Sequence, residues 1–171
     1  MNVELGTLSK VDLRTALSGD QVPLTNWLAA HLDRIGTALG MELELVSNEN
    51  APHGDILARD LGRKRTVIIE NALESSDDSR LGQLLTCASD RDAGAVVWVG
   101  PEFRTSHRRA LEWLNRRGAA EFYAIGLEVF QIGDSKPAAR FRLLAGPAGV
   151  TDAGGISIAA DCKSVVAVPE G

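Results

Sequence analysis

Two acidic residues, Asp55 and Glu70, stand at the ends of two apolar segments and are the side chains best placed for chemistry in this sequence. Asp55 begins the apolar part of GDILARD, and Glu70 lies near the end of RTVIIEN. Because successive side chains of a strand point to opposite faces, Ile68 and Glu70 would share one face of the second segment. A hairpin between the segments would therefore bring Asp55 beside Glu70.

Such a pair of carboxylates favours a metal ion. In a half-buried cleft, each of two adjacent carboxyl groups would have a raised pKa unless a cation lay between them. Mg²⁺ is usually held by one or two carboxylates together with waters and a substrate phosphate. The ion lowers the pKa of a bound water and stabilises the charge that develops on a phosphodiester. The pair thus predicts metal-dependent phosphodiester hydrolysis; the alternative is two strand ends whose carboxylates face solvent.

The elements that would position this pair follow from hydrophobic periodicity and from capping and turn residues. In chain order, the patterns predict a helix over 23–40, a strand over 41–47 with one face in solvent, strands over 54–60 and 65–71, a helix over 77–90, a strand over 93–100, a helix over 105–117 and strands over 121–133 and 139–145. Thr25 is the expected N-cap of the first helix, Gly40 ends it, and a turn centred on Gly62 joins the second and third strands.

This order of elements predicts an α/β protein, built as a single layered domain with a mixed central β-sheet flanked by helices. Segment 93–100 is apolar throughout, as expected for a central strand that is covered on both faces. A length of 171 residues suits one domain. We expect a core domain over 1–145 and a Gly/Ala-rich extension over 146–171, in which GISIAA and SVVAV could form edge strands.

Positive charge is clustered although the net charge is −5. That net charge argues against a nonspecific nucleic-acid coat but not against a local basic groove. Nine of the 18 Lys and Arg residues fall in segments 59–65 and 104–117, namely Arg59, Arg63, Lys64, Arg65, Arg104, Arg108, Arg109, Arg116 and Arg117. These arginines could contact phosphates, or they could simply solvate an outer helix face.

Targeting and redox features are sparse. No apolar run approaches the roughly 20 residues that span a bilayer, and the N-terminal residues lack the pattern of a secretory signal. These observations favour a cytoplasmic location. The two cysteines, Cys87 and Cys162, lie far apart without metal-ligand spacing. We expect two partly buried thiols, with a disulfide as the alternative.

The segments DILARD, RTVIIENAL, LGQLLTCA and AVVWVGPEFRTSHRRALEWLN together resemble the PD-(D/E)XK, restriction-endonuclease-like nuclease superfamily, over roughly residues 8–145. They are most similar to a bacterial branch that also carries a QxxxY-type helix. The resemblance implies that Asp55 and Glu70 are catalytic and hold Mg²⁺ or Mn²⁺, and that Gln83 supports the site or touches the substrate. It makes Asp20 the nearest candidate for a further metal ligand. It also implies DNA as substrate and partner, and a homodimer, because this fold often cuts two strands as a pair.

Four positions depart from that pattern. Ala72 stands where the family has lysine and this branch usually has glutamine, and Cys87 stands where the family has tyrosine. Asp78 and Arg80 occupy the region in which the branch typically carries histidines. Each change removes a polar group that would orient water, substrate or metal. Two functions therefore stay open: a metal-dependent DNA endonuclease, or a catalytically inactive nuclease-fold protein that binds nucleic acid or a protein.

Histidines and tryptophans are assigned mostly structural roles. We expect His31 to be a packed or rim residue and His107 to lie in the first turn of an arginine-rich helix. His53 lies two residues before Asp55 and belongs either to the cleft or to a solvated loop. Trp27, Trp98 and Trp113 are expected to be core anchors because each lies in a predicted element with apolar neighbours. No Ser-His-Asp arrangement, phosphate loop or CxxC pair is evident.

Overall fold

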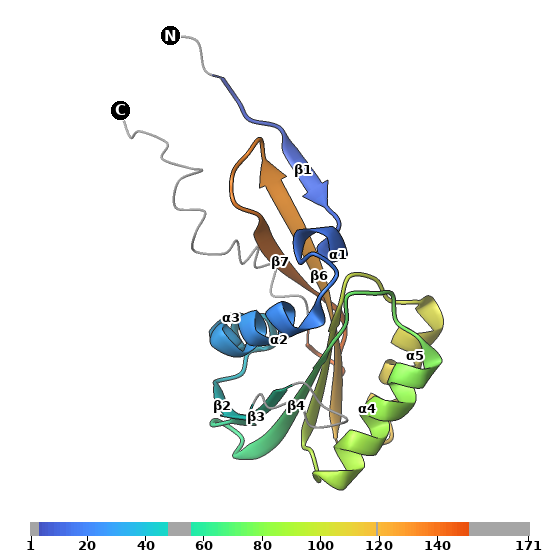
Figure 1. The fold of residues 1–171 in the computed structure, drawn as a ribbon. Helices are drawn as coiled ribbons and strands as arrows, with labels where there is room; N and C mark the ends of the chain where they lie inside the picture. The colour runs from blue at the N-terminus through green and yellow to red at the C-terminus, as the bar shows by residue number, and fades with distance from the viewer. Residues whose placement is uncertain (1–3, 48–55, 119, 151–171) are drawn as a thin grey trace.

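The chain forms a seven-stranded mixed sheet with helices on both faces, as the computed structural model shows for residues 4–47, 56–118 and 120–150 (Figure 1). This confirms the predicted α/β class with a single layered domain. The strands are β1 (Leu8–Val11), β2 (Leu43–Ser47), β3 (Ile56–Asp60), β4 (Arg65–Asn71), β5 (Ala95–Gly100), β6 (Glu121–Ile132) and β7 (Ala138–Ala145), and the helices are α1 (Leu13–Ala16), α2 (Gln21–Ala30), α3 (Leu32–Leu39), α4 (Asp78–Asp90) and α5 (Thr105–Asn115).

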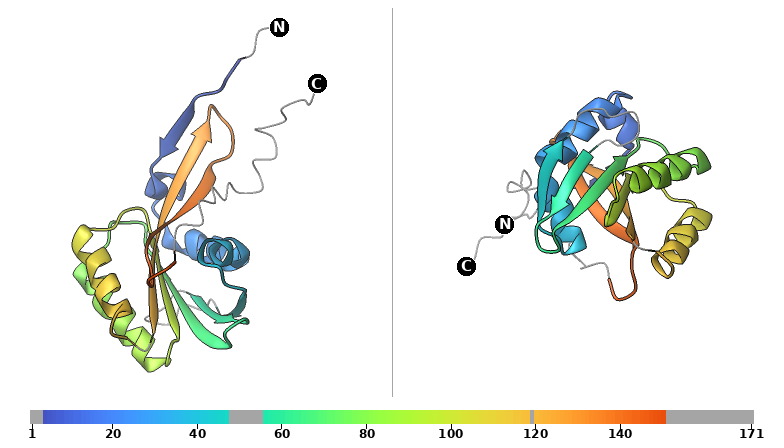
Figure 2. Two further views of the ribbon diagram at one scale, coloured as in Figure 1. Left: turned by 180° about the vertical axis from the view of Figure 1, so that it is seen from behind. Right: turned by 90° about the horizontal axis from the view of Figure 1, so that it is seen from below.

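The sheet has the order β1-β6-β5-β4-β3-β2, with β7 also paired to β6. Strands β2, β3 and β4 are antiparallel neighbours, whereas β4, β5 and β6 are parallel. Parallel neighbours need crossover connections, and α4 and α5 supply them. Figure 2 shows these two helices side by side on one face of the sheet, with α2 and α3 on the other.

Each face of the sheet buries its own apolar cluster. On the face covered by α2 and α3, Leu28 and Ile35 pack with alternate strand residues such as Ile69. On the opposite face, Leu84 of α4 and Leu111 of α5 pack with strand residues that include Ile68, Val96 and Trp98. Every residue of β5 is buried, as the sequence predicts for a central strand. The period-2 alternation in β4 therefore decides which side chains meet which helices.

Strand β6 is long enough to pair with three other strands. Its first half, Glu121–Gly126, pairs with β5, and Val129–Ile132 pairs with β1. Residues Ala124–Phe130 pair with β7. Because Ala124–Gly126 pair with both β5 and β7, these strands lie on opposite edges of β6. The distal half of β6 therefore extends beyond β5 as a ribbon with β1 and β7 (Figure 1).

The helix predicted over 23–40 is instead two helices, because the backbone departs from helical geometry at His31 (φ −128°, ψ 39°). The Nδ1–H of His31 donates to the carbonyl of Trp27 at 2.7 Å, while the backbone N–H of His31 turns to the carbonyl of Leu28. A continuous helix would pair that backbone N–H with Trp27, so the side chain competes with the helix for its acceptor. The rings of His31 and Trp27 also stack, with centroids 4.5 Å apart. His31 is thus a packed residue, as expected.

The first of these helices begins earlier than the sequence suggested. Its N-cap is Asp20, whose carboxylate accepts the backbone N–H of Val22 at 3.0 Å. Thr25, the expected cap, is buried within the helix, and its hydroxyl contacts the side chain of Asn71. Gly40 ends α3 in the left-handed conformation (φ 65°), as predicted. A carboxylate satisfies the free N–H groups of a helix start at least as well as a threonine does.

Three further expectations need correction. Strand β2 is an edge strand with both Leu45 and Val46 exposed, so it does not have one wet and one dry face. Helix α5, for which the sequence predicts Thr105 or Ser106 as the cap, instead has Arg104 as its N-cap residue, and no side chain caps it. Trp98 is buried and Trp27 partly buried, but Trp113 is 52% exposed and is not a core anchor. Trp113 follows the buried Leu111 by two residues, which rotates it by about 200° to the outer face of α5.

Several expectations fall on parts of the chain that lie outside the described residues. These are the roles of Asp55 and His53, the pairing of Cys162, and the edge strands GISIAA and SVVAV. Cys87 is buried on α4. Among the described helices, none combines the length and the apolar composition that crossing a bilayer requires.

Candidate functional site

The candidate site lies at the carboxyl end of β4, where Glu70 is only 6% exposed. In the parallel register Glu70 pairs with Trp98 of β5, and both belong to the face that α4 and α5 cover. In open α/β sheets, ligands bind beyond the carboxyl ends of parallel strands. Position and burial therefore make Glu70 the carboxylate with the strongest claim to a functional role among the described residues.

A cation from the protein itself contacts this carboxylate. Arg80 lies in the first turn of α4, and its Nη1 is 3.3 Å from Oε1 of Glu70. The same nitrogen donates to the backbone carbonyl of Asn71 at 3.1 Å. The start of a helix favours anions over cations, so these two acceptors compensate for a guanidinium in an unfavourable place. Arg80 thus occupies one side of Glu70 with a positive charge.

Asn71 joins the end of β4 to α2 on the opposite face of the sheet. Its side chain is fully buried and shares hydrogen bonds of 3.1–3.3 Å with the hydroxyl of Thr25. Its backbone carbonyl accepts Nε2 of Gln21 at 2.9 Å in addition to the bond from Arg80. Hydrogen bonds from α2 and from α4, on opposite faces of the sheet, therefore fix the end of β4, which carries Glu70.

The residues predicted for the site lie in different environments in the structure. Asp55 lies outside the described residues, but the β3–β4 register pairs Ile56, which follows it, with Ile69, which precedes Glu70. Gln83 is exposed on α4, whereas Cys87, one turn later, is buried. Asp20 is exposed and uses its carboxylate to cap α2. Of the predicted metal ligands, the described structure thus places only Glu70 in a buried site.

The described residues do not by themselves fit a divalent ion. No group of three or more His, Cys, Asp or Glu side chains among them could hold a metal. Ala72, one residue beyond the end of β4, is buried and offers no polar group. The cationic group next to Glu70 is the guanidinium of Arg80. A dication placed there would meet like-charge repulsion from this guanidinium.

A second polar cluster, not foreseen from the sequence, links the starts of α4 and α5. His107 is buried, with Nδ1 2.7 Å from the hydroxyl of Ser76 and Nε2 2.8 Å from Oδ1 of Asp78. The Ser76 hydroxyl also accepts the backbone N–H of Arg104 at 2.9 Å. A neutral imidazole satisfies all three contacts if Ser76 donates to Nδ1 and Nε2–H donates to Asp78. No sequence spacing signals this cluster, because Ser76 and His107 are 31 residues apart.

Ser76, His107 and Asp78 do not form a hydrolase triad. A nucleophilic serine must reach the substrate, and the carboxylate that orients the histidine is normally buried. Here Ser76 is 1% exposed and the Asp78 side chain is 91% exposed, which is the reverse arrangement. The hydrogen bond from His107 lowers the pKa of Asp78 below its ordinary value. The cluster is therefore a clasp between two helix starts rather than a catalytic centre.

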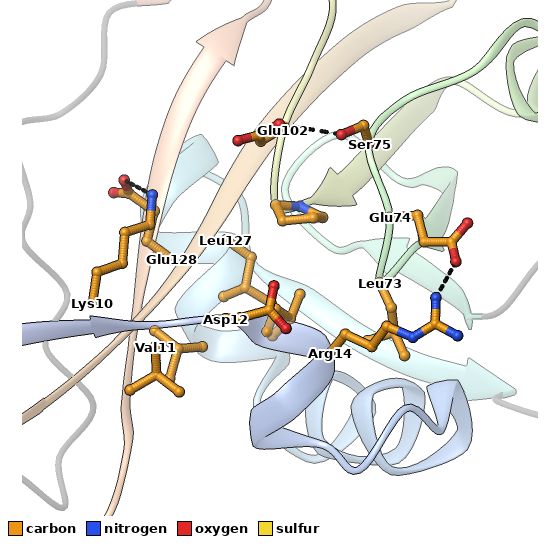
Figure 3. A pocket seen from close by; sticks show the side chains of 13 residues that line it. Lys10, Val11, Asp12, Arg14, Leu73, Glu74, Ser75, Glu102, Leu127 and Glu128 are labelled. Atoms are coloured by element: carbon orange, nitrogen blue, oxygen red, sulfur yellow. Dashed lines mark hydrogen bonds and ion pairs between the residues drawn. The ribbon is translucent and has the colours of Figure 1, made fainter.

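A cavity of about 400 Å³ near the carboxyl ends of the strands lies between β1, α1 and the loops that follow β4 and β5 (Figure 3). Its charged groups pair mostly with one another. Lys10 contacts Glu128 at 3.3 Å, Arg14 contacts Glu74, and Ser75 contacts Glu102. Asp12 accepts from the backbone and hydroxyl of Thr15 at the start of α1. The wall therefore offers few polar groups that a ligand could engage.

A partly buried ionic network lies at the opposite end of the sheet from Glu70. Arg65 donates to Asp60 at 3.1 Å, to Glu121 at 2.6 Å and to the carbonyl of Gly94 at 3.2 Å. Arg63 contacts both oxygens of the same Glu121 at 2.8 Å. Two cations of the 59–65 cluster are therefore already paired within the protein. Partial burial would raise the pKa of Glu121, but the hydrogen bonds from Arg65 and Tyr123 outweigh it and lower that pKa.

The chain's single tyrosine, Tyr123, gives this network a pH-dependent signature. Burial and then the Glu121 carboxylate, which accepts its hydroxyl at 2.7 Å, raise the pKa of Tyr123 to about 12. Tyrosinate absorbance should therefore titrate near pH 12 in the folded protein and near about 10 in denaturant. Because folding raises the pKa of Tyr123, its protonated hydroxyl contributes fully to the stability of the folded protein below a pH of about 10. That contribution is lost as the pH rises towards about 12.

The same titration of a Glu121→Gln variant provides the control. Removing the carboxylate should lower the pKa of Tyr123, because a negative neighbour no longer disfavours the phenolate. A native midpoint near the denatured value in the parent protein would contradict the network as described.

No family model matches the chain. Comparisons with curated proteins and with solved structures likewise return no match. The resemblance to the PD-(D/E)XK superfamily therefore stays a prediction that rests on the sequence segments quoted above.

Proposed function

We propose that this chain is a nucleic-acid-binding domain with a nuclease-like fold and a non-catalytic centre. The observation that carries the proposal is the contact between Arg80 and Glu70 at the end of β4. Where a metal-dependent nuclease needs a carboxylate facing a dication, this chain directs its own guanidinium at the carboxylate. Ala72 adds no lysine or glutamine beside it to activate a water or contact a phosphate.

Nucleic acid is the partner that the charge distribution favours. The chain has a net charge of −5, yet segment 104–117 holds five arginines and one glutamate. Arg104, Arg108, Arg109, Arg116 and Arg117 are all exposed. Clustered exposed arginines contact phosphates and supply most of the affinity of sequence-independent binding.

The test combines metal binding with cleavage. Calorimetric titration with Mn²⁺ or Mg²⁺ should give no heat that depends on Glu70 in the parent protein, and the Glu70→Gln variant should behave identically. Plasmid and oligonucleotide substrates should remain intact with either ion, while the parent should still shift their mobility. Metal-dependent cleavage that Glu70→Gln abolishes would overturn the proposal.

The Arg80→Gln variant sharpens this experiment. It removes the cation from Glu70 but keeps a polar, shorter side chain at the start of α4. If Arg80 is what excludes a dication, Arg80→Gln should gain heat with Mn²⁺, and the double variant Arg80→Gln/Glu70→Gln should lose it again. No gain in Arg80→Gln would contradict the role given to Arg80.

A metal-dependent DNA endonuclease is the second candidate, favoured by the β3–β4 register. Ile56, the first residue of β3, pairs with Ile69, which precedes Glu70. Asp55 precedes Ile56 in the sequence and lies outside the described residues. If cleavage does occur, loss of activity in both Asp55→Ala and Glu70→Ala would support this candidate.

A further inference from the structure

The outer face of α5 carries an exposed tryptophan. Trp113 is 52% exposed, whereas Leu111 and His107 of the same helix are buried against the sheet side. Burying an aromatic ring is strongly favourable, because each such side chain removes a large apolar area from water. A tryptophan held in solvent on a regular helix therefore needs an explanation other than packing.

Arginines surround this ring on the same face. Arg109 precedes Trp113 by four residues, and Arg116 and Arg117 follow it by three and four. Residues at these spacings are neighbours on a helix surface. The guanidinium carbon of Arg117 lies 5.7 Å from the centre of the Trp113 ring. The ring and the arginines thus form one surface, which we call the α5 face and define as Arg109, Trp113, Arg116 and Arg117.

The positive charge of the α5 face is not neutralised within the described part of the chain. No ion pair there joins any of these three arginines to a carboxylate. The other basic segment differs, because Arg63 and Arg65 are both bound to Glu121. Of the two arginine clusters, the one on α5 is therefore better suited to an external anion.

We propose that the α5 face binds single-stranded nucleic acid, with Trp113 stacking on an unpaired base and Arg109 and Arg116 contacting the flanking phosphates. The inference rests on the proposed nucleic-acid-binding function and assigns it a surface. Exposed aromatic rings beside basic side chains are how single strands are bound without sequence preference. A duplex keeps its base faces stacked inside and offers none to the ring. A membrane surface would require a broad apolar face, whereas the α5 face has one apolar side chain.

Fluorescence anisotropy with a labelled mixed-sequence single strand, as DNA and as RNA, tests the proposal. Trp113→Leu should weaken binding about five-fold or more, and Trp113→Phe should retain most of it because a benzene ring still stacks. A duplex of equal length should bind the parent more weakly than the single strand. In the parent, the bound strand should also quench the fluorescence of the exposed Trp113 but not that of buried Trp98.

Salt dependence separates stacking from charge. Removing one phosphate contact from a single strand lowers the slope of log K against log salt by about 0.7. Arg109→Ala should show this reduction, whereas Trp113→Leu should weaken binding at an unchanged slope. Arg59→Ala is the matched control, because it removes one exposed arginine from β3 instead of from α5. Its affinity should stay close to that of the parent.

The two proposals fail in different ways. If the parent binds single strands but Trp113→Leu and Arg109→Ala bind equally well, or if Arg59→Ala weakens binding as much as Arg109→Ala, the α5 face is not the site and the nucleic-acid function stands. Absence of quenching in a parent that binds would overturn the stacking role without any variant. If the parent binds no nucleic acid, both proposals are wrong.

Discussion

Replacing Arg65 by alanine is expected to destabilise the protein by about 3 kcal/mol, the lower end of the range for breaking a buried ion pair by removing one partner. Arg65 connects the end of β3, the start of β4, the residue before β5 and the start of β6 through Asp60, Gly94 and Glu121. Without it, the buried Asp60 loses its guanidinium partner and keeps only the backbone N–H groups of Gly62 and Arg63. Because these bonds remain, the expected loss lies at the lower end of that range.

Arg63→Ala is the matched control for Arg65→Ala. Both arginines bind Glu121, but the side chain of Arg63 is 58% exposed and that of Arg65 only 16%. An exposed pair contributes between about 0 and 1 kcal/mol, so Arg63→Ala should change little. Chemical denaturation would measure both, and a thermal melt should fall by about 6–12 °C for Arg65→Ala. Equal losses in the two variants would show that burial does not govern the network.

Replacing His107 by alanine should cost about 2–3 kcal/mol, because it leaves the buried hydroxyl of Ser76 without its ring partner and removes packing against Trp98. The loss of stability should also appear locally, at the start of α5. Hydrogen exchange at the backbone N–H of Arg104, which donates to Ser76, should accelerate because its acceptor is no longer held in place.

Two conservative variants decide which half of the clasp carries this energy. Asparagine at position 107 can reproduce the Nδ1 contact with Ser76, whereas glutamine can reproduce the Nε2 contact with Asp78. Since Ser76 is buried and Asp78 is exposed, His107→Asn should recover more stability than His107→Gln. The lowered pKa of Asp78 adds a pH signature: its contribution is present above the unfolded pKa of about 3.9 and is lost as the pH falls through the lower folded value. Better rescue by glutamine would contradict this division.

These two networks lie at opposite ends of the sheet, and neither includes Glu70. The Arg65 network ties together the amino ends of the parallel strands, and the His107 clasp ties the starts of α4 and α5 at their carboxyl ends. Arg80 lies within the first turn of α4, close in sequence to Asp77, which caps that helix at 2.8 Å. The clasp therefore helps to determine where the guanidinium that contacts Glu70 is placed. Loss of His107 is expected to loosen that contact before the sheet itself unfolds.

Much of the architecture was predictable because it depends on local patterns. The apolar segment RTVIIEN predicted β4 with its observed ends, Arg65 and Asn71. The uniformly apolar segment 93–100 predicted a buried central strand, which the structure shows over Ala95–Gly100. Periodicity failed where a side chain competed with the backbone, as His31 does by taking the carbonyl of Trp27 and ending α2. It also failed for Trp113, whose apolar neighbours along the chain are not its neighbours around the helix.

The sequence by itself determined the class of fold, the placement of Glu70 at the buried end of a strand, and the concentration of arginines on one helix. These follow from the period of each element and from composition, which act over a few residues. Only the tertiary structure decided that Arg80 contacts Glu70, that His107 joins Ser76 to Asp78, and that Arg65 pairs with a carboxylate 56 residues away. Such contacts depend on how the sheet brings strands and helices together. The spacing of two residues along the chain does not show whether they meet in space.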